Sequence, residues 1–245
     1  MHWQLHLLER LRTAVPIVRD VRPYGSVTTP DHLDRWSDLD VELDLTSDAD
    51  AGQLFDGTPW AWQDTRDHAD PTLQRLRLVL ADGRRVDAAV RGGTVRLPEP
   101  SPDNAVRFDL ALAATRFGRG ADLIGLHLVL GVVRSTLERW MAVEDRRTGT
   151  THHRSGSATD AAAARALAAL AGPLGPATVL QAAALHDEAR AALQEAARAE
   201  ARAALREAAR AAAHDGARAD VDTDAPTPDW SALRTIVGQT GTDPA

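Results

Sequence analysis

The chain has 245 residues, a formal net charge of −7 and no cysteine. This length has room for one large domain or two smaller ones, and the missing cysteines exclude disulfides, thiolate metal sites and thiol nucleophiles. All 28 basic side chains are arginine, which also excludes a P-loop lysine and a Schiff-base lysine. The acidic balance argues against a surface that follows a nucleic-acid backbone, and it favours a small or cationic partner.

The sequence predicts a cytoplasmic protein with no membrane partner. A secretory signal has a basic segment that leads into an apolar run. The first residues of this chain lack that pattern and soon reach the charged Glu9 and Arg10. The most apolar window, Leu123 to Val133, is too short to cross a bilayer. The oligomeric state stays open.

The first part of the chain alternates helical and strand patterns. Leucines at 5, 7, 8 and 11 have helical spacing, and Pro16 ends that helix before a short apolar strand over residues 17–21. Gly25 and Ser26 then form a turn. A second helix is expected to start within residues 30–34, with Thr29 as its cap and a proline at its first position.

A strictly alternating segment follows over residues 38–45, with carboxylates at 38, 40, 42 and 44 and apolar side chains between them. Strand periodicity puts all four carboxylates on one face. Leucines at 76, 78 and 80 predict another strand, Asp82-Gly83 predicts a hairpin turn, and residues 86–90 predict the partner strand. Asp87 therefore lies within a strand.

A proline-rich segment over residues 97–102 marks a domain boundary, because its three prolines at alternate positions favour extended chain over helix. The expected fold class is α+β. A first domain over residues 1–97 has a mixed β-sheet with flanking helices, and a second over 103–216 is an all-α helical bundle. Residues 217–245 are rich in Asp, Thr and Pro, and they are expected to form a flexible tail.

The second domain is expected to be helical almost throughout. Helices are predicted near residues 103–117 and 122–144, and the latter is apolar nearly all round, which is typical of the centre of a bundle. Residues 177–215 contain neither Gly nor Pro and are dominated by alanine, so long helices are expected there. In the tail, only a short turn near 230–237 is expected.

Three carboxylates, Asp38, Asp40 and Asp87, converge if their strands are neighbours in one sheet. Oxygen ligands of this kind suit Mg²⁺ or Mn²⁺, and two such ions can promote in-line displacement at phosphorus. Gly25 allows the backbone to approach phosphate closely, and the turn amides together with the Ser26 hydroxyl can hold a β- or γ-phosphate.

The run Tyr24-Gly25-Ser26, eleven residues, then Asp38-Leu39-Asp40-Val41 resembles the signature of the nucleotidyltransferase superfamily related to DNA polymerase β. In that family a third Asp on a later strand completes the metal site, and Asp87 matches this position. The resemblance implies metal ligands at Asp38, Asp40 and Asp87, phosphate contacts at Gly25 and Ser26, and ATP as the nucleotide donor.

The helical half adds to this resemblance. Residues 120–127 and 145–154 look like the C-terminal domains of bacterial aminoglycoside 6-adenylyltransferases and lincosamide nucleotidyltransferases. The likeness covers roughly residues 5 to 155. It implies Mg²⁺-dependent transfer of AMP from ATP to a hydroxyl of a small molecule bound between a catalytic domain and a helical one, with antibiotic resistance as the biological setting.

Other interpretations stay open at this point. The acidic face could be an ordinary solvated strand face, which is the favoured interpretation for Glu42 and Asp44. Packing is the default for Trp60 and Trp62, and residues 152–154 (His-His-Arg) could contact substrate or only shape a loop. The rival functions are nucleotide transfer to a protein side chain, as in nucleotidyltransferase antitoxins, and a catalytically silent nucleotide-binding module.

The resemblance leaves two roles unassigned. Many relatives carry a basic residue soon after the Gly-Ser pair, whereas residues 27–30 here are Val-Thr-Thr-Pro, so Arg35 or another arginine would have to bind the triphosphate. The general base is also open among Asp87, Glu138 and Glu144, and a metal-bound hydroxyl can dispense with a dedicated base.

Overall fold

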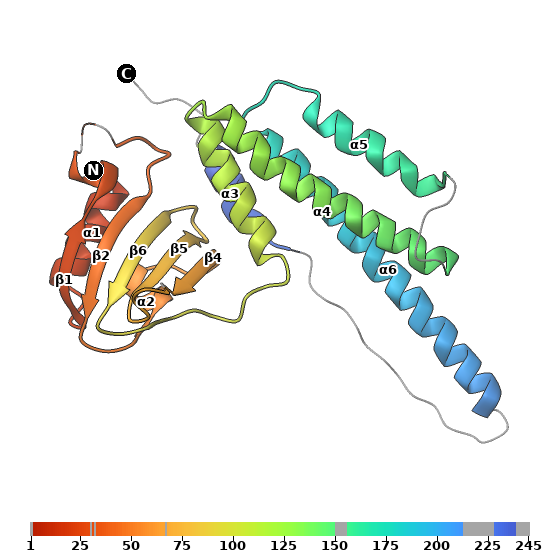
Figure 1. Ribbon diagram of the computed structural model, residues 1–245, viewed down its shortest axis with the longest axis horizontal. Helices are drawn as coiled ribbons and strands as arrows, with labels where there is room; N and C mark the ends of the chain where they lie inside the picture. The colour runs from red at the N-terminus through yellow and green to blue at the C-terminus, as the bar shows by residue number, and fades with distance from the viewer. Residues whose placement is uncertain are drawn as a thin grey trace.

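The computed structural model describes residues 2–29, 31, 33–66, 68–149, 156–212 and 228–238. These form a five-stranded mixed sheet in the first part of the chain and a group of helices in the second (Figure 1). This agrees with the expected combination of a mixed sheet with flanking helices and a helical second half.

The sheet has the strand order β1-β2-β6-β5-β4. Strands β2 and β6 run parallel, whereas every other neighbouring pair is antiparallel. The strands are β1 (Val18–Pro23), β2 (Leu39–Leu45), β4 (Pro59–Arg66), β5 (Gln74–Leu80) and β6 (Arg85–Arg91), and a separate two-stranded ribbon pairs β3 (Ala49–Asp50) with β7 (Val95–Arg96). The strands predicted at 17–21, 38–45, 76–80 and 86–90 are therefore present.

One face of the sheet is covered by two helices, α1 (Trp3–Thr13) and α2 (Ala51–Phe55). Leucines of α1 and the apolar side chains of α2 join the apolar side chains of β2, β5 and β6 in one buried cluster. Because β2 alternates, its apolar residues enter this core while its carboxylates point away from it. The opposite face of β2 is thus left polar.

No α-helix starts among the described residues of 30–34, although Asp31 has a 3₁₀-helical conformation. Pro30 and His32 lie outside them. From Leu33 the backbone forms no helix, and Asp34 instead closes a turn by accepting hydrogen bonds from the Trp36 amide at 2.9 Å and the Ser37 hydroxyl at 2.9 Å. An Asp side chain that bonds two residues ahead competes with helix formation in this way.

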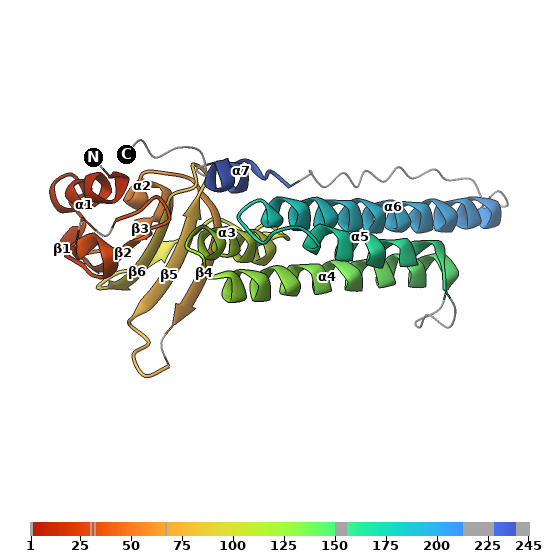
Figure 2. The ribbon, with the colours of Figure 1, turned by 90° about the horizontal axis from the view of Figure 1, so that it is seen from above.

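The second half contains α3 (Asn104–Gly118), α4 (Asp122–Thr148), α5 (Ala161–Leu170) and α6 (Thr178–Ala212). Figure 2 shows α4, α5 and α6 running away from the sheet, with α3 between them and β4. Helix α4 was expected at the centre of a bundle, but it is not buried on all sides. It packs on α3, α5 and α6 along one side only, and its other side exposes apolar residues, including Leu123 at 83%.

One segment of the C-terminal stretch forms a helix, where the sequence predicted a short turn at residues 230–237. Residues 231–238 form the helix α7 (Ser231–Gly238), which packs against α3. Leu233 and Ile236 are fully buried, and Trp230 makes an edge-to-face contact with Trp60 on β4. The apolar residues of this short segment are spaced to lie on one side of a helix, and their burial holds it in place although the surrounding sequence is polar. Residues 217–227 and 239–245 of the predicted tail lie outside the described residues.

Candidate active site

Asp40 and Asp87 lie side by side because β2 and β6 pair in parallel with these two residues as register partners. Asp38 immediately precedes β2 and is two residues from Asp40. Both strands bury their alternate apolar residues under α1 and α2, so a one-residue slip would bury the carboxylates instead. The predicted convergence of the three positions on one side of the sheet is present.

The loop before β2 is fixed from two sides. The Gln4 side chain of α1 donates a hydrogen bond to the Ser37 carbonyl at 2.9 Å, and the Arg85 guanidinium of β6 donates one to the Trp36 carbonyl at 2.5 Å. All four residues are buried. Bonds to buried carbonyls are costly to lose, so the backbone that leads into Asp38 is held in place.

Helix α3 adds a third attachment to this loop. Arg119, at its C-terminal end, binds the Asp34 carboxylate at 3.2 Å and the Ser37 hydroxyl at 3.0 Å. Trp36 packs so closely on Gly118 that a β-carbon there would lie 2.1 Å from the indole. The helical half thus helps to position the carboxylate loop.

The Gly25-Ser26 turn lies directly against Asp40. Residues 25–28 form a short 3₁₀ turn after β1, and the Tyr24 amide donates to the Asp40 carbonyl at 3.1 Å. Gly25 has φ +64°, and a β-carbon on it would stand 2.2 Å from Asp40 Oδ2. Only glycine satisfies both the backbone angle and the contact. Ser26 is half-buried beside it.

Burial and mutual repulsion raise the pKa values of the carboxylates. The pKa of Asp40 rises to about 6, mainly through burial and then through the negative charges of Asp38 and Asp87. Burial likewise raises the pKa of Asp87, although the nearby Arg77 opposes the shift. The pKa of Tyr24 is raised by burial and by the charges of Asp87 and Asp40. A site that accumulates negative charge in this way favours a bound cation.

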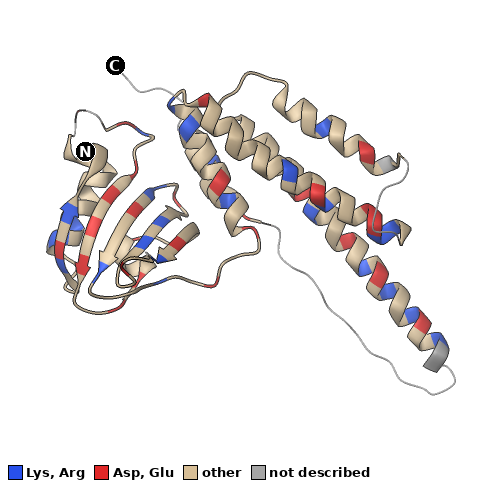
Figure 3. Ribbon diagram, in the orientation of Figure 1, with Lys and Arg blue, Asp and Glu red and all other residues tan. Residues whose placement is uncertain are grey.

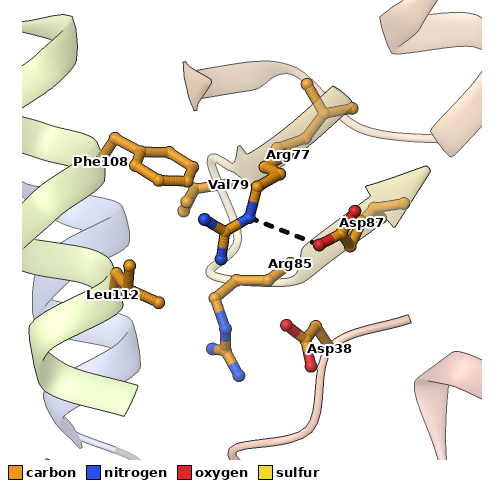
Figure 4. Close-up of a pocket in the computed structure, with 9 residues that line it drawn as sticks. Asp38, Arg77, Val79, Arg85, Asp87, Phe108 and Leu112 are labelled. Carbon is orange, nitrogen blue, oxygen red and sulfur yellow. Dashed lines mark ion pairs between the residues drawn. The ribbon is translucent and has the colours of Figure 1, made fainter. Parts of the chain in front are cut away.

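Two arginines that were not singled out from the sequence line a narrow cleft beside the carboxylates (Figure 4). Arg77 of β5 and Arg85 of β6 meet Asp38 and Asp87 there, under Phe108 of α3. Arg77 Nε lies 3.4 Å from Asp87 Oδ2. The free volume of the cleft is about 20 Å³, room for about one water molecule. Little free space is therefore left in this cleft beside the carboxylates.

The three carboxylates have the donor atoms that a divalent cation needs and lie near one another. Their side chains, however, are not oriented to hold one ion together. Three carboxylates are a donor set that Mg²⁺ and Mn²⁺ accept. Among the described residues, however, no group of three or more acidic or histidine side chains is arranged to hold a metal ion. One of the three, Asp87, is already paired with Arg77.

The other acidic residues of β2 have partners on β1. Glu42 pairs with Arg22 at 3.4 Å and Asp44 with Arg19 at 3.2 Å. Both pairs are partly exposed, which agrees with the solvated-face interpretation of these two positions.

The other residues considered from the sequence have structural partners or lie in the apolar clusters, apart from residues 152–154. Trp60 and Trp62 are buried in the two apolar clusters, as packing predicts. Glu138 pairs with a neighbouring arginine of its own helix, and Glu144 is buried where α4 meets the segment before α5, with Thr159 Oγ1 3.2 Å from its carboxylate. Residues 152–154 lie outside the described part of the chain.

No protein-family model and no curated protein sequence matches this chain. In the part of the chain that the structure describes, no helix has both the length and the apolar character needed to cross a membrane. The geometry of the carboxylate site therefore carries the functional inference.

A first prediction concerns Gly25. Gly25→Ala should lower the free energy of unfolding, measured with urea, by about 1 kcal/mol from the left-handed backbone and by roughly 1–3 kcal/mol more from the contact with Asp40. Gly120→Ala is the matched control, because Gly120 has φ +70° but no atom lies within 4 Å of the place where its β-carbon would stand. Equal losses in the two variants would contradict the close packing of the turn on Asp40.

A second prediction concerns the protonation of Asp40. Its carboxyl carbon, followed by NMR, should titrate with a midpoint near pH 6, and Asp38→Asn should lower that midpoint because it removes a neighbouring negative charge. The raised pKa means that the folded state binds this proton more tightly than the unfolded state does. Its contribution to stability is therefore present at acid pH and lost as the pH rises through about 6. A midpoint near the ordinary aspartate value, about 4, would contradict the burial and crowding described here.

Proposed function

We propose that the protein is a metal-dependent nucleotidyltransferase that transfers AMP from ATP to a hydroxyl of a small molecule. The observation that carries the proposal is the pairing of Asp40 with Asp87 on adjacent parallel strands, with Gly25 packed against Asp40. Carboxylates beside a glycine turn combine a cation site with a backbone that phosphate can approach.

Each residue has a distinct role in this proposal. Asp38, Asp40 and Asp87 hold Mg²⁺ or Mn²⁺, which when bound stabilises the charge that develops during displacement at phosphorus. The amides of Gly25 and Ser26, with the Ser26 hydroxyl, orient the phosphates. The backbone bond from Tyr24 to Asp40 keeps the turn and the carboxylates at a fixed separation, which favours in-line geometry.

The proposed acceptor is a small hydroxylated molecule, such as an aminoglycoside or lincosamide antibiotic. The acidic chain disfavours a nucleic acid. An open surface hollow of about 340 Å³ lies along α4 beside Asp109 of α3, and its lining includes His127 and Arg134 of α4 together with apolar residues. Its size is within the range of small-molecule sites, and its polar groups suit a polyfunctional acceptor.

A third prediction tests the activity. Radiolabelled ATP, Mg²⁺ and a panel of aminoglycosides and lincosamides should give labelled product and pyrophosphate, and Asp40→Asn and Asp87→Asn should each reduce the rate by about a hundredfold or more. Glu42→Gln is the matched control. It removes a carboxylate from the same face of β2, but this carboxylate pairs with Arg22 of β1 and has no role in the proposed metal site. It should leave the rate within about twofold of wild type.

The alternatives predict other outcomes. Label on a protein, with none on the small molecules, would favour a protein acceptor. If the Asp40→Asn variant keeps the wild-type rate, the carboxylates do not take part in the reaction. Nucleotide binding without pyrophosphate release on any acceptor would favour a silent nucleotide-binding module.

A further inference from the structure

The pairing of Arg77 with Asp87 follows from the fold. Arg77 is the register partner of Asp87 on the antiparallel neighbour β5, and its Nε lies 3.4 Å from Asp87 Oδ2. Its guanidinium also lies 5.4 Å from the centre of the Phe108 ring (Figure 4). Arg77 thus places a positive charge directly beside the carboxylate that the proposed function assigns to a divalent cation.

We propose that Arg77 exchanges partners during substrate loading: it neutralises Asp87 in the empty site and binds a phosphate of the nucleotide once a divalent cation takes Asp87. This inference rests on the proposed function. It assigns the triphosphate-binding arginine that the sequence left open, and it links metal loading to nucleotide loading through one side chain.

The pair has the properties that an exchange requires. The side chains of Arg77 and Asp87 are 36% and 34% exposed, and ion pairs between partly exposed side chains are weak. A divalent cation carries twice the charge of a guanidinium and therefore displaces it at modest cost. Arg85 cannot exchange in the same way, because it is buried and bonded to the Trp36 carbonyl.

The released guanidinium suits a phosphate. The chain has no lysine, so side-chain cations for a triphosphate must be arginines, whose planar fork matches phosphate oxygens in a bidentate manner. The acidic positions of β2 and the basic positions of β5 flank β6, the strand that carries Asp87 (Figure 3). A metal ion can therefore bind next to the carboxylates while its phosphates bind next to the arginines.

The exchange predicts effects of opposite sign from one substitution. Arg77→Gln should bind Mn²⁺ alone roughly tenfold more tightly, since a competing charge is gone. It should bind a nonhydrolysable ATP analogue at saturating Mn²⁺ roughly tenfold more weakly, since a phosphate ligand is gone. A pair that is only structural would change neither affinity, or weaken both. Electron paramagnetic resonance measures the first affinity and calorimetry the second.

Three further variants complete the experiment. Arg77→Lys keeps the charge and should restore Mn²⁺ affinity close to wild type. Arg91→Gln is the matched control, because Arg91 lies on β6 four residues beyond Asp87 and pairs with Asp70 at 3.2 Å; it should change neither affinity by more than about twofold. Asp40→Asn reports whether the bound ion is at this site.

The outcomes separate the two levels of the argument. If Asp40→Asn weakens Mn²⁺ binding but Arg77→Gln leaves both affinities unchanged, or shifts them in the same direction, the exchange is wrong and the proposed function stands. If Mn²⁺ binds wild type and Asp40→Asn equally, or binds none of the variants, the metal site and the exchange are both wrong. Opposite shifts in Arg77→Gln, absent in Arg91→Gln, support the exchange.

Discussion

The parallel pairing of β2 with β6 is the constraint on which the site depends. It joins two strands that are far apart in sequence and sets Asp40 opposite Asp87. The apolar residues between the carboxylates are buried under α1 and α2, so hydrophobic burial fixes the register and the register fixes the charges. The cost of crowding these charges is visible in the raised pKa of Asp40.

The two halves of the chain depend on each other around this pairing. Arg119, which directly follows α3, holds the loop before Asp38, and Phe108 of α3 lies over Arg77. In return, Trp60 of β4 packs on Trp230 beside α7. Contacts of this kind place the helical half next to the carboxylate face, where an acceptor has to bind. The residues that shape the site therefore come from both halves.

The alternation of polar and apolar residues in the sequence predicted the strands and the carboxylate face. Along 38–45 a strand can bury the apolar residues only if all the carboxylates lie on the opposite face. This alternation could not predict the Arg77–Asp87 pair. A two-residue hairpin at Asp82-Gly83 would set Arg77 opposite Ala88, whereas the observed turn, in which the Gly83 amide donates to the Leu80 carbonyl, shifts the pairing by one residue. The packing of α7 and the exposed side of α4 also depend on tertiary contacts that no short window contains.

In the proposed function, Asp40 and Asp87 share a divalent cation when nucleotide binds. The most direct measurement is a crystal structure with Mn²⁺ and a nonhydrolysable ATP analogue, with manganese located by its anomalous scattering. We expect an anomalous peak between the carboxylates of Asp40 and Asp87, with Arg77 turned from Asp87 to a phosphate. A nucleotide-bound structure with no peak there and the Arg77–Asp87 pair intact would contradict it.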